Sequence, residues 1–128
     1  MNIELLRKVQ AHIMEEPARL LMSRWSQRVT GKTHVGGLWE GFKELPVPSC
    51  GTVCCIAGWT CVISQRKPSE EKAIELLELD MDQGDRLFLV GQWPEAFAIA
   101  YFDADTPEQR AQVACGRIDR FIKTDGSE

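Results

Sequence analysis

The sequence predicts a mainly α-helical fold: a single compact helical domain over residues 1–128, with five to six helices and one long irregular loop at about 29–51. Apolar residues recur at helical spacing through most of the chain, and good helix-capping residues precede several of these stretches. Glycine and proline, which break such periods, concentrate in one segment. A length of 128 residues is that of one domain able to bury its own core.

The first helix is expected to begin after Asn2, which can cap it, and to end before Pro17. Its inner face would carry the residues at helical spacing, namely Leu5, Leu6, Val9, His12 and Ile13. The following stretch, "ARLLMSRWSQR", is compatible with a second, shorter helix or with irregular structure. Residues 29–49 hold four glycines and two prolines, so they predict a long loop or a small hairpin.

Thr52 is the expected cap of a small-residue helix, "VCCIAGWTCVISQ". Ser69 should cap the next helix, whose first turn is acidic and whose inner residues would be Ile74, Leu77 and Met81. A short helix can then begin at Asp80 or Asp82 and run through "RLFLV".

Two further helices complete the predicted fold. The stretch "WPEAFAIAYF" suits a helix with Pro94 at its first position. The last helix is predicted with Thr106 as its cap and Pro107 at its first position. Its apolar stripe consists of Ala111, Ala114, Ile118, Phe121 and Ile122.

The charge is unevenly distributed along the chain. Residues 1–66 carry eight Lys or Arg against five Asp or Glu, whereas residues 67–128 carry seven against fourteen. The basic run Arg19, Arg24, Arg28 and Lys32 could face an acidic partner or the acidic half of a second copy, or could simply be solvated. The total of −4 argues against general nucleic-acid binding.

No apolar run approaches the length of a membrane-spanning helix, and the amphipathic N-terminus does not resemble a secretion signal. We therefore expect a cytoplasmic protein with no membrane partner. Five cysteines cannot all pair within one chain, which fits reduced thiols.

Four cysteines lie within "CGTVCCIAGWTC", residues 50–61, and three roles could explain this cluster. Cys50 could be a nucleophile or redox sensor near a helix N-terminus, with His34 as its base. Zinc could bind here, but the second, distant ligand pair of the usual structural sites is missing. We favour packing, because cysteine, alanine and glycine at helical spacing let a neighbouring helix approach closely. We expect no metal and no cofactor.

The run from Cys50 to Trp59 resembles the C-G-T-x-x-C-[IL]-A-G motif of a family of small, uncharacterised bacterial and phage proteins. The stretches "AIELLEL", "RLF", "WP" and "TPEQRAQVACGRIDRFI" agree with the same pattern, so the resemblance covers about residues 1–124. It implies a shared fold and no assigned reaction. Cys54 departs from the pattern, which leaves Cys50 and Cys55 as the cysteines to which a role could carry over.

Trp39 and Phe42 lie among glycines in the predicted loop, where they could form a binding surface or fold back onto the core. With Arg24 and Arg28 they make up the predicted contact surface. We therefore expect a non-enzymatic accessory or regulatory protein that binds an unidentified protein, with a homodimer as one option. A specific version is a small acidic inhibitor of a host defence complex. The alternative is a thiol-dependent enzyme or redox sensor that uses Cys50 with Cys55 and His34.

Overall fold

The computed structural model describes residues 1–22, 27–28 and 52–128, and these residues are mainly α-helical. Within them lie six α-helices, as expected: α1 (Ile3–Glu15), α2 (Ile56–Ile63), α3 (Glu70–Leu77), α4 (Met81–Phe88), α5 (Glu95–Asp103) and α6 (Pro107–Lys123). Two short 3-10 turns, η1 (Pro17–Arg19) and η3 (Val90–Gln92), connect some of them. The predicted loop at about 29–51 lies outside the described residues.

Local capping sets where most of the helices begin. Asn2 accepts a hydrogen bond from the Leu5 N–H, and Ser69 accepts one from the Lys72 N–H, both as predicted. Asp80 with Gln83, and Thr106 with Gln109, form reciprocal capping boxes. Each cap satisfies a backbone donor that has no partner inside its own helix, so these starts follow from neighbouring residues alone.

The predicted start of α2 was wrong. Thr52 and Val53 form the short strand β2 (Thr52–Val53), which pairs antiparallel with β1 (Gln27–Arg28). Cys54 then donates its N–H to Arg19 O and accepts at its carbonyl from the Leu21 N–H. These long-range bonds hold residues 52–54 extended, and the helix begins only at Ile56, with Cys55 as its cap.

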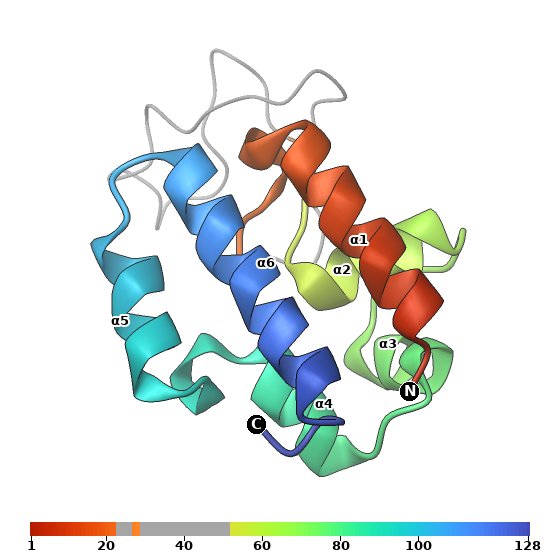
Figure 1. Cartoon of the computed structure of the whole chain (residues 1–128). Helices are drawn as coiled ribbons and strands as arrows, with labels where there is room; N and C mark the ends of the chain where they lie inside the picture. The colour runs from red at the N-terminus through yellow and green to blue at the C-terminus, as the bar shows by residue number, and fades with distance from the viewer. Residues whose placement is uncertain (23–26, 29–51) are drawn as a thin grey trace.

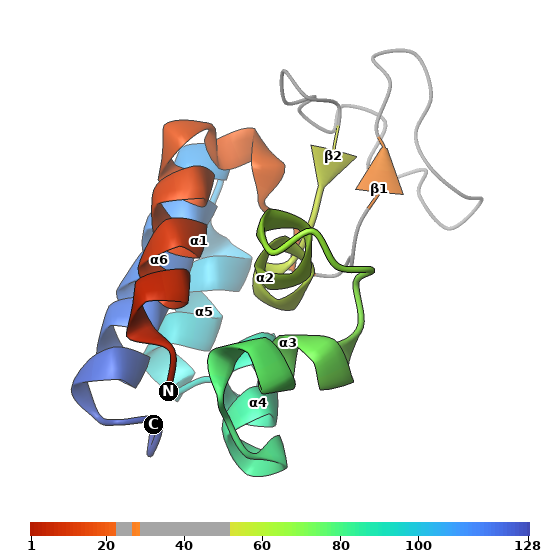
Figure 2. The same ribbon diagram turned by 90° about the vertical axis from the view of Figure 1, so that its right-hand side faces the viewer.

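The helices enclose one core, to which α6 and α2 contribute most. Figures 1 and 2 show α1 and α6 side by side, with α2 against them and with α3 and α4 below α2, at the end of the molecule where both termini lie. The most deeply buried side chains include Leu6, Ile13, Ile56, Leu77, Ile118 and Phe121. Met81 was expected on the inner face but is 58% exposed, because it is the first residue of α4 and lies directly after the cap.

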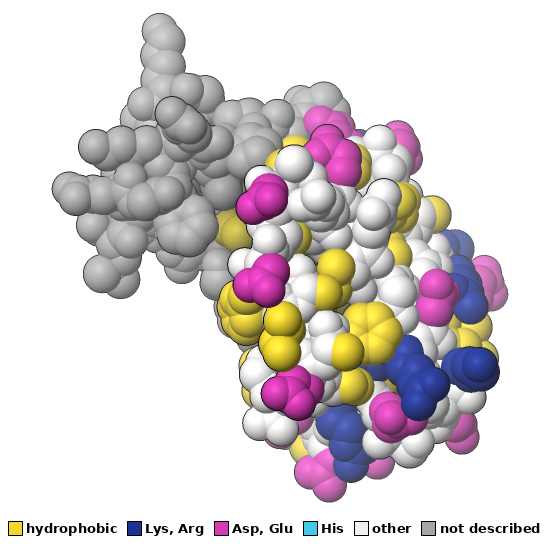
Figure 3. All heavy atoms as spheres, turned by 60° about the vertical axis from the view of Figure 1, so that its left-hand side comes forward, with side chains coloured by type: hydrophobic (Ala, Val, Ile, Leu, Met, Phe, Trp, Pro, Cys, Tyr) yellow, Lys and Arg dark blue, Asp and Glu magenta, His cyan; other side chains and the backbone are white. Residues whose placement is uncertain are grey.

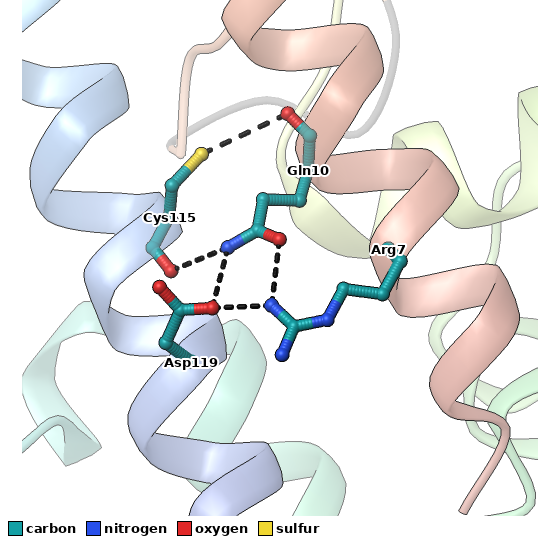
Figure 4. A network of polar contacts seen from close by, with 4 residues as sticks. All are labelled: Arg7, Gln10, Cys115 and Asp119. Carbon is teal, nitrogen blue, oxygen red and sulfur yellow. Dashed lines mark hydrogen bonds and ion pairs between the residues drawn. The ribbon is translucent and has the colours of Figure 1, made fainter.

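A polar network joins α1 to α6 on the outside of this core (Figure 4). The Gln10 side-chain amide donates to Cys115 O and to the Asp119 carboxylate, both at 2.9 Å. Arg7 forms an ion pair with the same carboxylate and also donates to Gln10 Oε1. The hydrogen bond from Gln10 and the nearby Arg7 charge lower the pKa of Asp119. The network therefore fixes the register of the two helices.

The C-terminal end of α4 is held by side chains from two other segments. The Trp93 indole N–H donates to Leu87 O, and the Arg117 guanidinium donates to Arg86 O, both at 2.9 Å. Arg117 is fully buried and lies over the Phe121 ring, and burial lowers its pKa to about 10. A cation at the negative end of a helix dipole and over an aromatic face is favourably placed, so Arg117 connects α6 to α4.

Candidate interaction surface

Helix α5 has a composition unlike the other helices of the described chain. Its sequence, "EAFAIAYFD", is apolar at every position between its two acidic ends. Of its nine residues only Tyr101 is buried. Of the described elements it contacts α6 and η3 alone. A helix that is apolar on all sides is normally buried on all sides, so it is unusual that the outer side of α5 is exposed to solvent.

The inner side of α5 is held by specific contacts. The Tyr101 hydroxyl accepts a hydrogen bond from the Met22 N–H at 3.2 Å, and the Tyr101 ring packs edge-on against Trp93 at 5.5 Å. Phe97 lies over Gly116 of α6, where an added Cβ would be 3.4 Å from the ring. Because these three contacts fix the rotation of α5, they also decide which side chains point outward.

The outer side presents large apolar groups to solvent. Ile99 is 52% exposed and Phe102 is 71% exposed, and the alanines Ala96 and Ala100 beside them are exposed as well. Figure 3 looks onto the side of the molecule on which α5 lies and shows hydrophobic side chains gathered there between acidic ones. Exposed patches of this kind, bordered by polar residues, are typical of protein-binding surfaces. We call Ala96, Ile99, Ala100 and Phe102 the α5 face.

The border of the α5 face is acidic. Glu95, Asp103, Asp105 and Glu108 are all exposed, and no lysine or arginine occurs between Arg86 and Arg110. Within the part of the chain that the structure describes, none of these four carboxylates forms an ion pair. The half-buried Arg110 directs its guanidinium to Ala104 O instead. The face therefore combines an apolar centre with unpaired negative charge.

Most of the predicted contact residues lie outside the described residues: Arg24, Trp39 and Phe42, together with Cys50 and His34 of the thiol alternative. Arg28 lies in β1, where its backbone pairs with that of Thr52. Trp59 and Trp93 are buried, as expected.

Cys55 lies in surroundings unlike those of a reactive thiol. It is 5% exposed, and its sulfur accepts a hydrogen bond from the Gly58 N–H at 3.3 Å as the cap of α2. Burial raises the pKa of Cys55, and burial with help from Asp119 raises that of Cys115 to about 11. A nucleophilic cysteine needs the opposite shift. Cys54 and Cys61 are buried as well, and the described residues contain no cluster of three or more potential metal ligands.

A second group of polar side chains surrounds His12 at the end of α1. The His12 ring packs edge-on against Trp59 at 4.4 Å, and Arg19 donates to the His12 carbonyl at 3.0 Å. Arg19 also pairs with Glu15 and Glu16. Burial lowers the pKa of His12, and Arg19 lowers it further, whereas Glu15 and Glu16 act in the opposite direction. Burial and Arg19 therefore favour the neutral form of this imidazole.

The fold and this surface define a small, mainly α-helical protein with one exposed, acid-bordered apolar helix. No protein-family model matches the chain, and no curated protein or solved structure does so either. The resemblance to the C-G-T-x-x-C-[IL]-A-G proteins thus stays a prediction from the motif. None of the helices in the described residues is long and apolar enough to cross a membrane.

Sequence reasoning missed the α5 face. It predicted the helix at "WPEAFAIAYF" but assigned it no role. Two signals were present: an unbroken apolar run between acidic residues, and the absence of any basic residue from 87 to 109. Neither of them says which side of the helix is covered.

Proposed function

We propose that this chain is a non-enzymatic accessory protein that acts by binding another protein through the α5 face. The observation that carries the proposal is the exposure of Ile99 and Phe102 on a helix whose inner side is fixed by Tyr101. Large aromatic and aliphatic side chains at the centre of a contact contribute most of the binding energy in protein complexes. Leaving two of them in water costs solubility without adding to the core.

A more specific form of the proposal concerns the type of partner system. The balance of seven basic against fourteen acidic residues in 67–128 suits a small acidic inhibitor of a host defence complex, acting in the cytoplasm of a bacterium. Acidic proteins of this kind can occupy a basic channel that otherwise receives nucleic acid. The predicted contact residues Arg24, Arg28, Trp39 and Phe42 would extend the same binding role to a second segment of the chain.

The test compares three tagged proteins as baits in a bacterial host lysate: wild type, Ile99→Gln/Phe102→Gln, and Met81→Gln/Leu89→Gln. The second double variant is the control, because Met81 and Leu89 are also exposed apolar residues but lie in and after α4. Glutamine is a good helix former, so both variants should keep the wild-type circular dichroism spectrum.

We expect wild type and control to retain one protein in comparable amounts. The α5 variant should lose at least about 90% of it, as the removal of a binding hot spot predicts. Equal capture by all three baits, or no specific capture by any, would contradict the proposal.

A further inference from the structure

The order of residues along α5 places charge on both sides of its apolar centre. Glu95, Ile99 and Asp103 are spaced four residues apart, so they form one row along the outer side of the helix. Each carboxylate is therefore about 6 Å along the helix axis from Ile99. A partner that covers Ile99 must also come close to both charges.

Some carboxylates of the described chain are already paired with a cation. Asp119 is paired with Arg7, Glu75 with Lys72 and Glu128 with Arg120. Glu95 and Asp103 are exposed and have no such partner among the described residues. In Figure 3 basic side chains lie to the right of and below the hydrophobic group, whereas acidic ones border its left side. The negative charge on the outer side of α5 is thus available to a binding partner.

This charge pattern discriminates between possible occupants of the face. If a second copy paired through α5 about a two-fold axis, Glu95 would approach Asp103 or Glu95 of the other copy, depending on the helix orientation. Like charges brought together across an interface cost several kcal/mol. An anionic lipid surface or a nucleic acid would be repelled in the same way. A protein surface with lysine or arginine beside its apolar centre has the complementary pattern.

We infer that the α5 face binds a partner surface whose apolar contact residues are flanked by lysine or arginine, with Glu95 and Asp103 pairing to one cation on each side of Ile99. This inference rests on the proposed function and adds the chemistry of the partner. The apolar centre supplies affinity, and the two carboxylates select the partner and fix its orientation.

The test uses two labelled helical peptides of about 18 residues, or five turns. They share one leucine and alanine face, and they carry lysine or glutamate beside that face. Fluorescence anisotropy measures the binding of each peptide to the full chain at about 50 mM and about 300 mM salt, a range over which exposed charges become strongly screened.

The lysine peptide should bind at least about tenfold more tightly than the glutamate peptide at low salt, and this preference should shrink at high salt. In Glu95→Gln/Asp103→Gln the preference should fall below about threefold. The control Glu71→Gln/Glu78→Gln removes the same charge from exposed residues in and after α3, so it should keep the wild-type preference.

Equal binding of both peptides, no binding of the lysine peptide, or a preference that Glu95→Gln/Asp103→Gln leaves unchanged would overturn the inference. A wild-type dimer in sedimentation that Ile99→Gln/Phe102→Gln dissociates would also overturn it, because the occupant would then be a second copy. The proposed function fails separately, when the lysate capture is insensitive to Ile99→Gln/Phe102→Gln.

Discussion

His12 is a titratable side chain held between an aromatic ring and a cation. Trp59 packs against one side of it, and Arg19 lies within 3.4 Å of its Nδ1. Its Nε2 is buried and has no hydrogen-bond partner. A protonated His12 ring would carry its charge in a partly desolvated place and close to the positive charge of Arg19. The Glu15 and Glu16 carboxylates offset only part of this energetic cost.

The stability of the protein should therefore fall as the solution is acidified from about pH 7.5 to about pH 5.5. The pKa of His12 is lowered in the folded state, so the unfolded chain, with a histidine pKa of about 6.5, binds the proton first. The contribution of neutral His12 to the free energy of unfolding is fully present above about pH 6.5, and it is lost as the pH falls through the lowered pKa of the folded state. Urea unfolding followed by circular dichroism at several pH values measures this loss.

The chain has two histidines, so the effect can be assigned to one of them. His12→Asn keeps an acceptor in the place of Nδ1 and should give a midpoint that no longer depends on pH in this window. His34→Asn should leave the wild-type dependence in place. If the urea midpoint of His12→Asn changes with pH as much as that of wild type, the assignment to His12 is wrong.

Burial also decides what the cysteines can do. Cys54, Cys55, Cys61 and Cys115 are all buried, and the pKa of Cys55 and that of Cys115 are raised. A pKa of about 11 at Cys115, against an ordinary 9.0, leaves about one-hundredth of the usual thiolate at neutral pH. The predicted burial of the cysteines is confirmed for Cys54, Cys55 and Cys61, although Cys54 lies before α2 rather than on it, and Cys50 lies outside the described residues.

At the scale of elements, α3 and α4 approach each other closely at Gly84. A Cβ added at this glycine would lie 2.7 Å from both Cγ1 and Cδ1 of Ile74. Glycine is a poor helix residue, and alanine at an open site would gain up to about 1 kcal/mol. Here the contact with Ile74 opposes that gain, because well-packed cores resist added atoms.

We expect Gly84→Ala to lower the free energy of unfolding by about 1–3 kcal/mol despite the better helix propensity. Adding Ile74→Val, which removes the terminal methyl group, should recover part of that loss. Gly91→Ala is the control: nothing lies within 4 Å of its added Cβ, so its effect should stay within about 0.5 kcal/mol. Chemical denaturation measures all three. A stabilising Gly84→Ala would mean that the two helices separate easily.

The boundaries of the elements were predictable where their cause is local. Asn2, Ser69 and Thr106 cap their helices through residues three positions away, and such pairs can be seen in the sequence. Thr52 has the same chemistry but lies in a strand, because its neighbours bond to Arg19 and Leu21. A pairing over more than 30 residues overrides the local preference, and nothing close to Thr52 in sequence indicates it.

At the scale of the whole molecule, the packing of α1 against α6 joins two helices from opposite ends of the described chain. Gln10 and Asp119 are 109 residues apart and share a hydrogen bond, while the Gln10 amide also reaches Cys115 O. Because all the helices share one core, the protein should unfold in one step. Tryptophan fluorescence and circular dichroism should then give the same urea midpoint.

Gln10→Ala should lower that common midpoint by the equivalent of about 1–2 kcal/mol, because it removes two hydrogen bonds between the helices. Gln112→Ala, at an exposed position of α6, should change it by less than about 0.5 kcal/mol. Two separate unfolding transitions would contradict one-step unfolding. Equal effects of the two variants would contradict a stabilising role for the Gln10 hydrogen bonds.

The α5 face could not be predicted from the sequence, because a contact distant in the sequence decides which side of the helix is buried. The sequence "EAFAIAYFD" has no polar side, so periodicity cannot tell Ile99 from Tyr101. The distinction arises when Tyr101 bonds to Met22, which is 79 residues away. The predicted contact residues Trp39 and Phe42 lie outside the described residues, and their role stays a prediction.

The pairing of α1 with α6 has a consequence for the nascent chain. Synthesis proceeds at about 5–20 residues per second, so roughly 5–20 s separate the appearance of Gln10 from that of Asp119. During that time the stripe Leu6, Val9 and Ile13 lacks the α6 surface that later covers it. The apolar side chains of α1 therefore emerge from the ribosome exposed to solvent, and they become fully covered only after α6 has been synthesised.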